Sequence, residues 1–375
     1  MTWDEAREHA LFWLATLVRD ARGLFAQREA KSVPTDVNIE PTNLCNANCV
    51  FCGYQFQERP HTQMPVATGL AIIDAARRAG VTQLGLTPIV GDPLIHRNVE
   101  AFVRYAREGP APLYVGLTTN GILLTLERYR ALVAAGVQEI VISMTYPDET
   151  EYRRIYRSAK LKAVVGNIGH ILDLPKAETC KMSIGVRTDR RGDWASHPLF
   201  VRARERGWSV DRNRFFDDWS GRTSEIAESE GLWTRPNRPK VVPCSMTYTG
   251  PHFMSDGRAT ACGCRDLDGG RELALSSDAL LADMRAVYAS GEVAALREAF
   301  RDGRAPPICQ SCRHYNPAFA GEPAHRRVGQ LLGDAAAAVK DLAAIVRAAA
   351  SEKAGRAPEA DPVRAEAVSE AALPE

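Results

Sequence analysis

The feature that most constrains the fold is a sixfold alternation of short apolar runs and helical stretches between residues 37 and 216. The apolar runs predict strands over 37–40, 83–88, 113–119, 139–145, 181–188 and 208–216. Six strand–helix repeats imply a parallel sheet with right-handed crossovers. Because a closed barrel of this type needs eight repeats, the sequence predicts an α/β fold built on an open, partial (β/α)6 TIM-like barrel. In such a sheet the chemistry lies at the C-terminal ends of the strands.

Helical spacing and breakers place the helices between these strands. They are predicted over 67–79, 98–108, 126–135, 149–174 with a break near Lys160, and 197–206. Gly80 and Gly136 come just after two of them, where a left-handed cap favours glycine. A further amphipathic helix is predicted over 3–30, ended by Pro34. The apolar residues at helical spacing in this segment are Leu11, Leu14, Leu17 and Val18.

The regular pattern stops near Gly221, and the rest of the chain divides by composition. Residues 221–240 are polar, contain Pro236 and Pro239, and are interpreted as a linker. The stretch 241–317 is irregular and rich in cysteine, with one helix near 290–300 and Ser290 as its N-cap. From residue 335 the chain is alanine-rich and helical in propensity, and the tail after Lys353 is expected to be disordered. The predicted organisation is a helix (1–34), the barrel (35–220), a small C-terminal iron–sulfur domain (241–320) and an alanine-rich helix with its tail (335–375).

Charge and hydropathy exclude several kinds of partner. The chain has 47 basic and 46 acidic residues, a net charge of +1, so no overall field attracts nucleic acid or anionic lipid. No run approaches the roughly 18 apolar residues of a membrane span. Asp4 and Glu5 stand where a secretory signal would carry basic residues. A cytoplasmic protein without nucleic-acid or membrane partners is therefore expected.

The cysteines indicate metal sites. Seven of the nine fall in close groups, and clustered thiols in a large cytoplasmic chain favour metal over disulfides. Cys45, Cys49 and Cys52 lie within eight residues just after the first predicted strand. A loop of this kind can bind three irons of a cubic 4Fe–4S cluster and leave the fourth iron open. The alternative is structural zinc with His61 as fourth ligand, but the position at the mouth of the barrel favours the cluster.

With Phe51 before the last cysteine, the Cys-x3-Cys-x2-Cys pattern resembles the signature of the radical S-adenosylmethionine (SAM) enzymes. The resemblance covers about residues 35–220. It implies a 4Fe–4S cluster whose open iron binds S-adenosylmethionine, and an external one-electron reductant of the flavodoxin or ferredoxin type. It also implies a 5′-deoxyadenosyl radical that abstracts a hydrogen atom from the substrate.

Further positions resemble cofactor-binding motifs of the same family. Gly91 and Asp92 match its Gly-Gly-Glu-Pro turn, although Val90 replaces a glycine and Asp92 replaces the glutamate. The resemblance implies that this turn holds the methionine amino group. It likewise implies cofactor contacts for Ser143, at the end of the fourth strand, and for Arg157, in the following helix, where a guanidinium fork suits a carboxylate. The alternatives are a simple turn and an ordinary surface arginine.

A second cysteine group lies downstream. Cys244, Cys262, Cys309 and Cys312 supply four ligands, and their spacing resembles the Twitch domain, a shortened SPASM extension that carries one auxiliary 4Fe–4S cluster. Zinc in a four-thiolate site is the alternative. Cys264 is then surplus. It exchanges with Cys262 as ligand, is a buried thiol, or acts as a catalytic hydrogen-atom donor.

Together these features predict a radical SAM oxidoreductase acting on a small polar molecule, such as an aminocyclitol, an amino sugar or another glycan precursor. The outcome is dehydrogenation or epimerisation. Arg187, Asp217 and Asp218 follow the fifth and sixth strands and are candidates for substrate contacts, with ordinary loop solvation as the alternative. Cys180 is expected in the core. The alternative function is a peptide- or protein-modifying maturase, which the short stretch of about 35 residues before the first strand disfavours. A metal-binding scaffold without catalysis is disfavoured by the glycine–acid turn and the six repeats.

Overall fold

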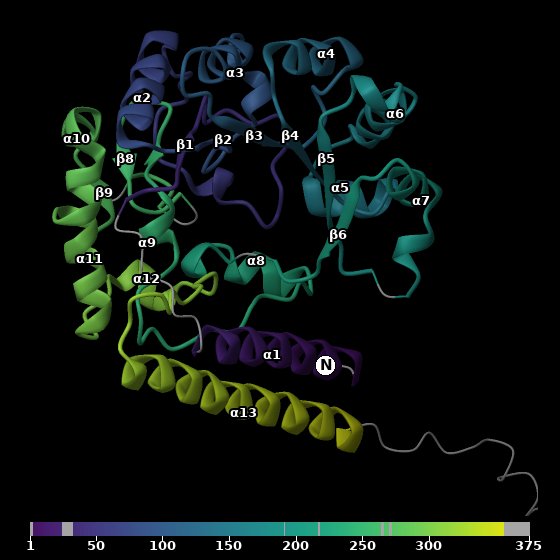
Figure 1. The fold of residues 1–375 in the computed structure, drawn as a ribbon. Coiled ribbons are helices and arrows are strands. Elements are labelled where there is room, and N and C mark those ends of the chain that lie inside the picture. The colour runs from purple at the N-terminus through teal and green to yellow at the C-terminus, as the bar shows by residue number, and fades with distance from the viewer. Residues whose placement is uncertain are drawn as a thin grey trace, which may run out of the picture.

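Six parallel strands form the centre of the protein. The computed structural model describes residues 3–24, 33–190, 192–216, 218–263, 266–269 and 272–355. The strands are β1 (Asp36–Ile39), β2 (Gln83–Leu86), β3 (Tyr114–Thr119), β4 (Glu139–Met144), β5 (Lys181–Arg187) and β6 (Ser209–Asn213). They pair in the order β6-β5-β4-β3-β2-β1, each parallel to its neighbour. The open, partial barrel predicted from the repeats is confirmed (Figure 1).

Helices cover the outer face of this sheet. They are α2 (Val66–Ala79), α3 (Val99–Arg107), α4 (Leu126–Ala135), α5 (Glu149–Tyr156), α6 (Leu161–Leu172) and α7 (Pro198–Glu205). The predicted break near Lys160 is present, since Lys160 caps α6. Gly80 and Gly136 cap α2 and α4 with φ of 75° and 98°, as predicted. Along each strand, side chains alternate between a fully buried outer face and a half-buried inner face.

The C-terminal segment extends the same sheet, which the sequence pattern did not predict. Strand β7 (His252–Phe253) pairs parallel to β1, and β8 (Ala259–Thr260) and β9 (Ala274–Leu275) follow in antiparallel fashion. Four helices pack beside them, namely α9 (Met246–Thr249), α10 (Ser277–Ala289), α11 (Glu292–Arg301) and α12 (Pro307–Ser311). Five short 3-10 helices lie at Gly53–Phe56, Pro93–Ile95, Lys176–Glu178, Trp194–Ser196 and Trp219–Gly221. The barrel therefore shares one continuous sheet with the cysteine-rich C-terminal segment.

The prediction of a single helix near 290–300 with Ser290 as its N-cap is wrong. Ser290 ends α10, and its hydroxyl donates to the Ala286 carbonyl. Ser276 is the N-cap of that helix, because its hydroxyl accepts from the amide of Ala279. Helix α11 starts after Gly291.

Helices α1 (Trp3–Leu24) and α13 (Ala324–Gly355) lie side by side on the far side of the segment that joins the barrel to β7 (Figure 1). The apolar spacing predicted for α1 is not its buried face, since Leu11 and Leu14 are 48% and 59% exposed. Trp13 is buried instead, and its indole N–H donates to Asp341 at 2.9 Å. Helix α13 starts 11 residues before the predicted point. Residues 25–30, which the prediction included in the first helix, lie outside the described residues, as does the predicted tail beyond residue 355.

Residues 221–240 are not an exposed linker. They contain helix α8 (Ser224–Ser229), and Arg238 is buried between α1 and α13. Its guanidinium pairs with Asp20 and, at 2.7 Å, with Asp334. A buried charge needs such partners, so this pair of carboxylates explains why polar residues occupy an interior position.

Within the described residues, no helix combines the length and hydropathy needed to cross a bilayer.

Candidate functional site

The first three cysteines lie at the C-terminal ends of the strands. The loop after β1 brings Cys45, Cys49 and Cys52 to one pocket. Four further predicted residues line the same pocket, namely Phe51, Gly91, Asp92 and Ser143. The structure therefore brings together residues from β1, β2 and β4 that are up to about 100 positions apart in the chain.

The cysteine loop is docked on the end of helix α5. The amide of Val50 donates to the Ile155 carbonyl at 2.9 Å, and the amide of Asn48 donates to the Tyr156 carbonyl at 3.3 Å. The last carbonyls of a helix have no partner within it, so the loop satisfies them. Helix α5 ends at Tyr156, and Arg157 turns away with a φ of 47°.

The environment of these thiols suits a cationic centre. Burial, followed by the nearby charge of Asp92, raises the pKa of Cys45 to about 12. Burial also raises the pKa of Cys49, with further contributions from Cys52 and Cys45. Cys49 is buried and Cys45 and Cys52 are half-buried, so the three thiols bind together as thiolates only when a positive group compensates their charge. The donor set thus fits an iron–sulfur cluster.

The turn after β2 requires its glycine. Gly91 has a φ of 115°, and a Cβ there would lie 2.5 Å from the Thr42 carbonyl oxygen. Asp92 beside it is 2% exposed and already accepts three donors, from the amides of Leu94 and Asn120 and from the Thr119 hydroxyl. The Asp92 carboxylate therefore joins the end of β2 to the end of β3 as well as bordering the pocket.

The two candidate arginines lie in different places. Arg157 is exposed, does not line the pocket, and donates to the Gln55 side chain at 3.1 Å. Arg187, at the end of β5, stacks 4.6 Å over the Phe51 ring, and its Nε donates to the Ser143 hydroxyl at 3.2 Å. The guanidinium beside the pocket residues is thus that of Arg187, for which the sequence suggested a substrate contact.

The sequence analysis did not predict several residues that line the pocket, among them Asn120 and Tyr156. Asn120 holds the cysteine loop, because its amide nitrogen lies 2.7 Å from the Asn46 side-chain oxygen and 3.8 Å from Cys45 Sγ. Its position directly after the predicted third strand could have marked it. The Tyr156 hydroxyl lies 2.9 Å from that of Ser143. No sequence signal marks Tyr156, because the docking of α5 alone places it there.

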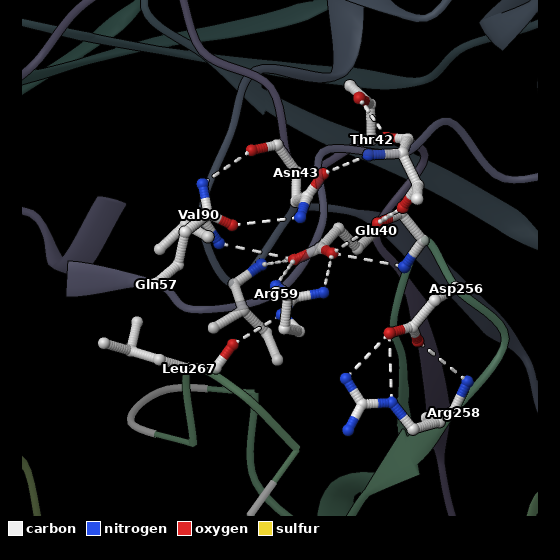
Figure 2. A network of polar contacts seen from close by, with 12 residues as sticks. Glu40, Thr42, Asn43, Gln57, Arg59, Val90, Asp256, Arg258 and Leu267 are labelled. Carbon is white, nitrogen blue, oxygen red and sulfur yellow. Dashed lines mark hydrogen bonds and ion pairs between the residues drawn. The ribbon is translucent and has the colours of Figure 1, made fainter. Parts of the chain in front are cut away.

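A buried ion pair, Glu40 with Arg59, lies beside the β2 turn (Figure 2). Glu40 follows β1, and both its carboxylate oxygens accept from the Arg59 guanidinium, at 2.7 and 3.1 Å. Neither side chain is more than 2% exposed. The fork geometry and the extra donors around it are what a buried pair needs to be stable.

The same pair links three parts of the chain. Glu40 accepts from the Val90 amide in the β2 turn at 3.4 Å and from the Ser255 amide in the C-terminal segment at 3.1 Å. Arg59 donates to the Leu267 carbonyl at 2.7 Å. The loop that follows the cysteines, the β2 turn and the C-terminal hairpin are therefore fixed to one another through a single buried charge pair (Figure 2).

Several other predicted residues lie away from the pocket. His61 stacks on Tyr54 with ring centroids 5.9 Å apart and does not border the thiols, so the geometry does not favour it as a zinc ligand. Asp218 is buried and pairs with Arg313 at 2.8 Å, which compensates its charge within the protein. Cys180 is half-buried against the core, 3.8 Å from the Tyr129 hydroxyl. Asp217 and Cys264 lie outside the described residues.

The second cysteine group surrounds one apolar cavity in the C-terminal segment. Its four members, Cys244, Cys262, Cys309 and Cys312, all border this cavity. Burial, then the charges of Cys244 and Cys312, raises the pKa of Cys309. Among the described residues, no three His, Cys, Asp or Glu side chains meet closely enough to hold a single metal ion. The four thiols are thus gathered around one apolar space in this segment.

Comparison with known protein families identifies the first part of this arrangement. The family model for the radical SAM superfamily matches residues 39–195. This span runs from the end of β1 through β5 and includes the cysteine loop and its pocket. Residues 39–195 are therefore a radical SAM domain.

Individual curated relatives match only part of the chain, at modest sequence identity. The GTP 3′,8-cyclase of Chlorobaculum tepidum is 29% identical over 139 residues, 37% of this chain and 41% of the relative. The chain thus matches less than half the length of that curated relative.

Two solved structures share the fold. One is BtrN in complex with AdoMet and 2-DOIA, with a TM-score of 0.54 and 14% identity, covering 77% of this chain and 96% of that one. The other is Streptococcus suis SuiB bound to the precursor peptide SuiA, with a TM-score of 0.54 and 15% identity, covering 84% and 76%. At these identities the likeness concerns the fold alone.

Proposed function

We propose that this protein is a radical SAM oxidoreductase that removes a hydrogen atom from a small polar substrate, such as an aminocyclitol, an amino sugar or another glycan precursor. The observation that carries the proposal is the pocket at the ends of β1, β2 and β4, where three thiols meet Gly91 and Ser143. Chemistry at this edge of a parallel barrel is the rule for the fold.

In this proposal Cys45, Cys49 and Cys52 hold a 4Fe–4S cluster and leave one iron open. With an electron from an external flavodoxin- or ferredoxin-type reductant, such a cluster cleaves S-adenosylmethionine and supplies a 5′-deoxyadenosyl radical. Gly91 lets the β2 turn pack against the backbone of residues 42–44, which leads into the cysteine loop, because no Cβ fits there. The Ser143 hydroxyl and the Arg187 guanidinium, 3.2 Å apart, form a donor pair suited to the methionine carboxylate. We assign this role to Arg187 rather than to the exposed Arg157.

We further propose that Cys244, Cys262, Cys309 and Cys312 hold a second, auxiliary 4Fe–4S cluster in a Twitch-like domain. Support comes from the apolar cavity that all four thiols border. A buried group of this kind suits electron transfer to or from a substrate, whereas the alternative, four-thiolate zinc, carries only a structural role.

A peptide or protein substrate is the second candidate function. SuiB, which shares the fold, is described as bound to a precursor peptide. A screen of aminocyclitols, amino sugars and candidate precursor peptides for substrate-stimulated 5′-deoxyadenosine release distinguishes the two.

Metal content tests both clusters at once. After anaerobic reconstitution with iron and sulfide, we expect about eight irons per chain, four for each cluster. The reduced holoprotein should then release 5′-deoxyadenosine from S-adenosylmethionine. Four irons with one zinc would assign the C-terminal cysteines to a structural zinc site. Absence of cofactor cleavage in a fully loaded, reduced protein would contradict the radical function.

Cys264 separates dehydrogenation from epimerisation. If its thiol returns a hydrogen atom to the substrate, Cys264→Ala should keep about eight irons and still cleave the cofactor, but lose the epimerised product. Wild-type product formed in deuterated water should then carry one deuterium at the altered carbon, because thiol hydrogens exchange with solvent. No deuterium and an active Cys264→Ala would indicate dehydrogenation. Loss of the auxiliary cluster would make Cys264, and not Cys262, the ligand.

A further inference from the structure

The inner face of the sheet contains an open chamber beneath the radical pocket. It encloses about 810 Å³, its mouth included. The inward side chains of four strands line it, among them Asp36, Asn38, Tyr114, Thr118 and Glu139. Gly116 leaves room on this face, since a Cβ there would meet only ordinary contacts at 3.7 Å. A barrel interior is normally filled by branched apolar side chains, so small and polar residues here indicate space for a ligand.

The chamber adjoins the radical pocket. Thr87 and Thr118 border both spaces, and their hydroxyls are 3.3 Å apart. Along β3, Tyr114 lies four residues before Thr118, which corresponds to about 13 Å of strand. A molecule with one end at the radical pocket can therefore extend to the carboxylates at the other end of the chamber.

The two carboxylates of the chamber, Glu139 and Asp36, differ in whether a cationic side chain pairs with them. Glu139 accepts from the Tyr114 hydroxyl at 3.2 Å and pairs with the Lys181 ammonium at 2.9 Å. Asp36 accepts only from neutral groups, the Asn38 amide and the Thr35 hydroxyl, both at 3.2 Å. Among the described residues, no cationic side chain forms an ion pair with Asp36. Its half-buried negative charge is thus left without a counter-charge.

Further features show that this charge is uncompensated. Burial is the main cause that raises the pKa of Asp36. Nearby, the Tyr288 hydroxyl is fully buried and makes no hydrogen bond within the described part of the chain. Burial, followed by the charge of Asp36, raises the pKa of Tyr288. A half-buried anion close to a buried hydroxyl without a partner is costly unless a cation joins it.

We propose that the chamber binds the substrate through a primary ammonium group that pairs with Asp36, while the carbon that loses its hydrogen lies toward Thr87 and Thr118, where the chamber borders the radical pocket. The inference rests on the proposed radical function and specifies its substrate class as a primary amine. The same chemistry is offered by an aminated small molecule or by a lysine side chain of a peptide.

The test measures binding by calorimetry to the reconstituted holoprotein with S-adenosylmethionine present, and needs no turnover. The small-molecule probes are 2-deoxystreptamine, an aminocyclitol, and myo-inositol, its neutral counterpart. The peptide probes are a blocked lysine tripeptide and its norleucine counterpart. The variants are Asp36→Asn, Gly116→Val, and the control Asp211→Asn on β6, which is exposed and does not line the chamber.

We expect wild type to bind at least one aminated probe about tenfold or more tightly than its neutral counterpart, as charge-assisted hydrogen bonds imply. Asp36→Asn should remove this preference, Gly116→Val should weaken binding by filling the chamber, and Asp211→Asn should behave as wild type. Which probe pair shows the effect identifies a small-molecule or a peptide substrate. Equal binding of aminated and neutral probes in wild type, or an unchanged preference in Asp36→Asn, would overturn the inference. Failure of the radical function is recognised separately, by the absence of 5′-deoxyadenosine from wild type.

Discussion

Replacing Cys45, Cys49 and Cys52 together by alanine is expected to abolish 5′-deoxyadenosine formation, down to the level of an enzyme-free mixture. The three thiols border one pocket, and methyl groups cannot bind iron. The C-terminal cysteines border a separate cavity. The triple variant should therefore keep about four irons and the absorbance of the auxiliary cluster. Iron analysis and chromatography of the nucleoside product measure the two effects on the same sample.

The control for this experiment is Cys180→Ala. That thiol packs against the core near Tyr129 and borders neither cysteine cavity. It should keep about eight irons and full cofactor cleavage. Cleavage that persists in the triple variant would contradict the assignment of the radical site.

The sequence predicts the barrel well because each signal there is local. The buried runs of β1 to β5 alternate with helices whose ends are marked by Gly80, Gly136 and Lys160, and the observed bounds follow the predicted ones within one or two residues. The residues around the cysteine loop were also found together, because the ends of parallel strands meet at one edge.

The failures of sequence reasoning concern contacts between distant segments. The end of α5 is set by its docking on the cysteine loop, and this moves Arg157 out of the helix and away from the pocket. The buried face of α1 contains Asp20 because Arg238 reaches it from residues that look like a polar linker. The extension of the sheet by β7 is likewise not visible in so short a run. None of these partners is near its counterpart in the chain, so no local pattern indicates them.

The buried pair of Glu40 and Arg59 gives the second large expected effect, on stability. Glu40→Gln should lower the free energy of unfolding by about 3–5 kcal/mol, because it leaves a buried guanidinium without its counter-charge. The double variant Glu40→Gln with Arg59→Met removes both charges and keeps one side-chain oxygen, which can accept from the Ser255 amide or from the Val90 amide. It should recover more than half of the loss, since a neutral replacement of both partners has no uncompensated charge.

The matched control is the exposed pair of Asp173 and Arg202, whose side chains are 67% and 45% exposed. Asp173→Asn should change the free energy of unfolding by less than about 1 kcal/mol, because water screens such pairs. Urea unfolding under anaerobic conditions, followed by cluster absorbance and by circular dichroism, measures all three variants. If Glu40→Gln is as stable as Asp173→Asn, the pair does not hold the cysteine loop, the β2 turn and the C-terminal hairpin together. If it is unstable and the double variant is restored, the loss comes from the uncompensated guanidinium, and the pair stabilises the contact of the cysteine loop and the β2 turn with the C-terminal segment, in addition to the pairing of β7 with β1.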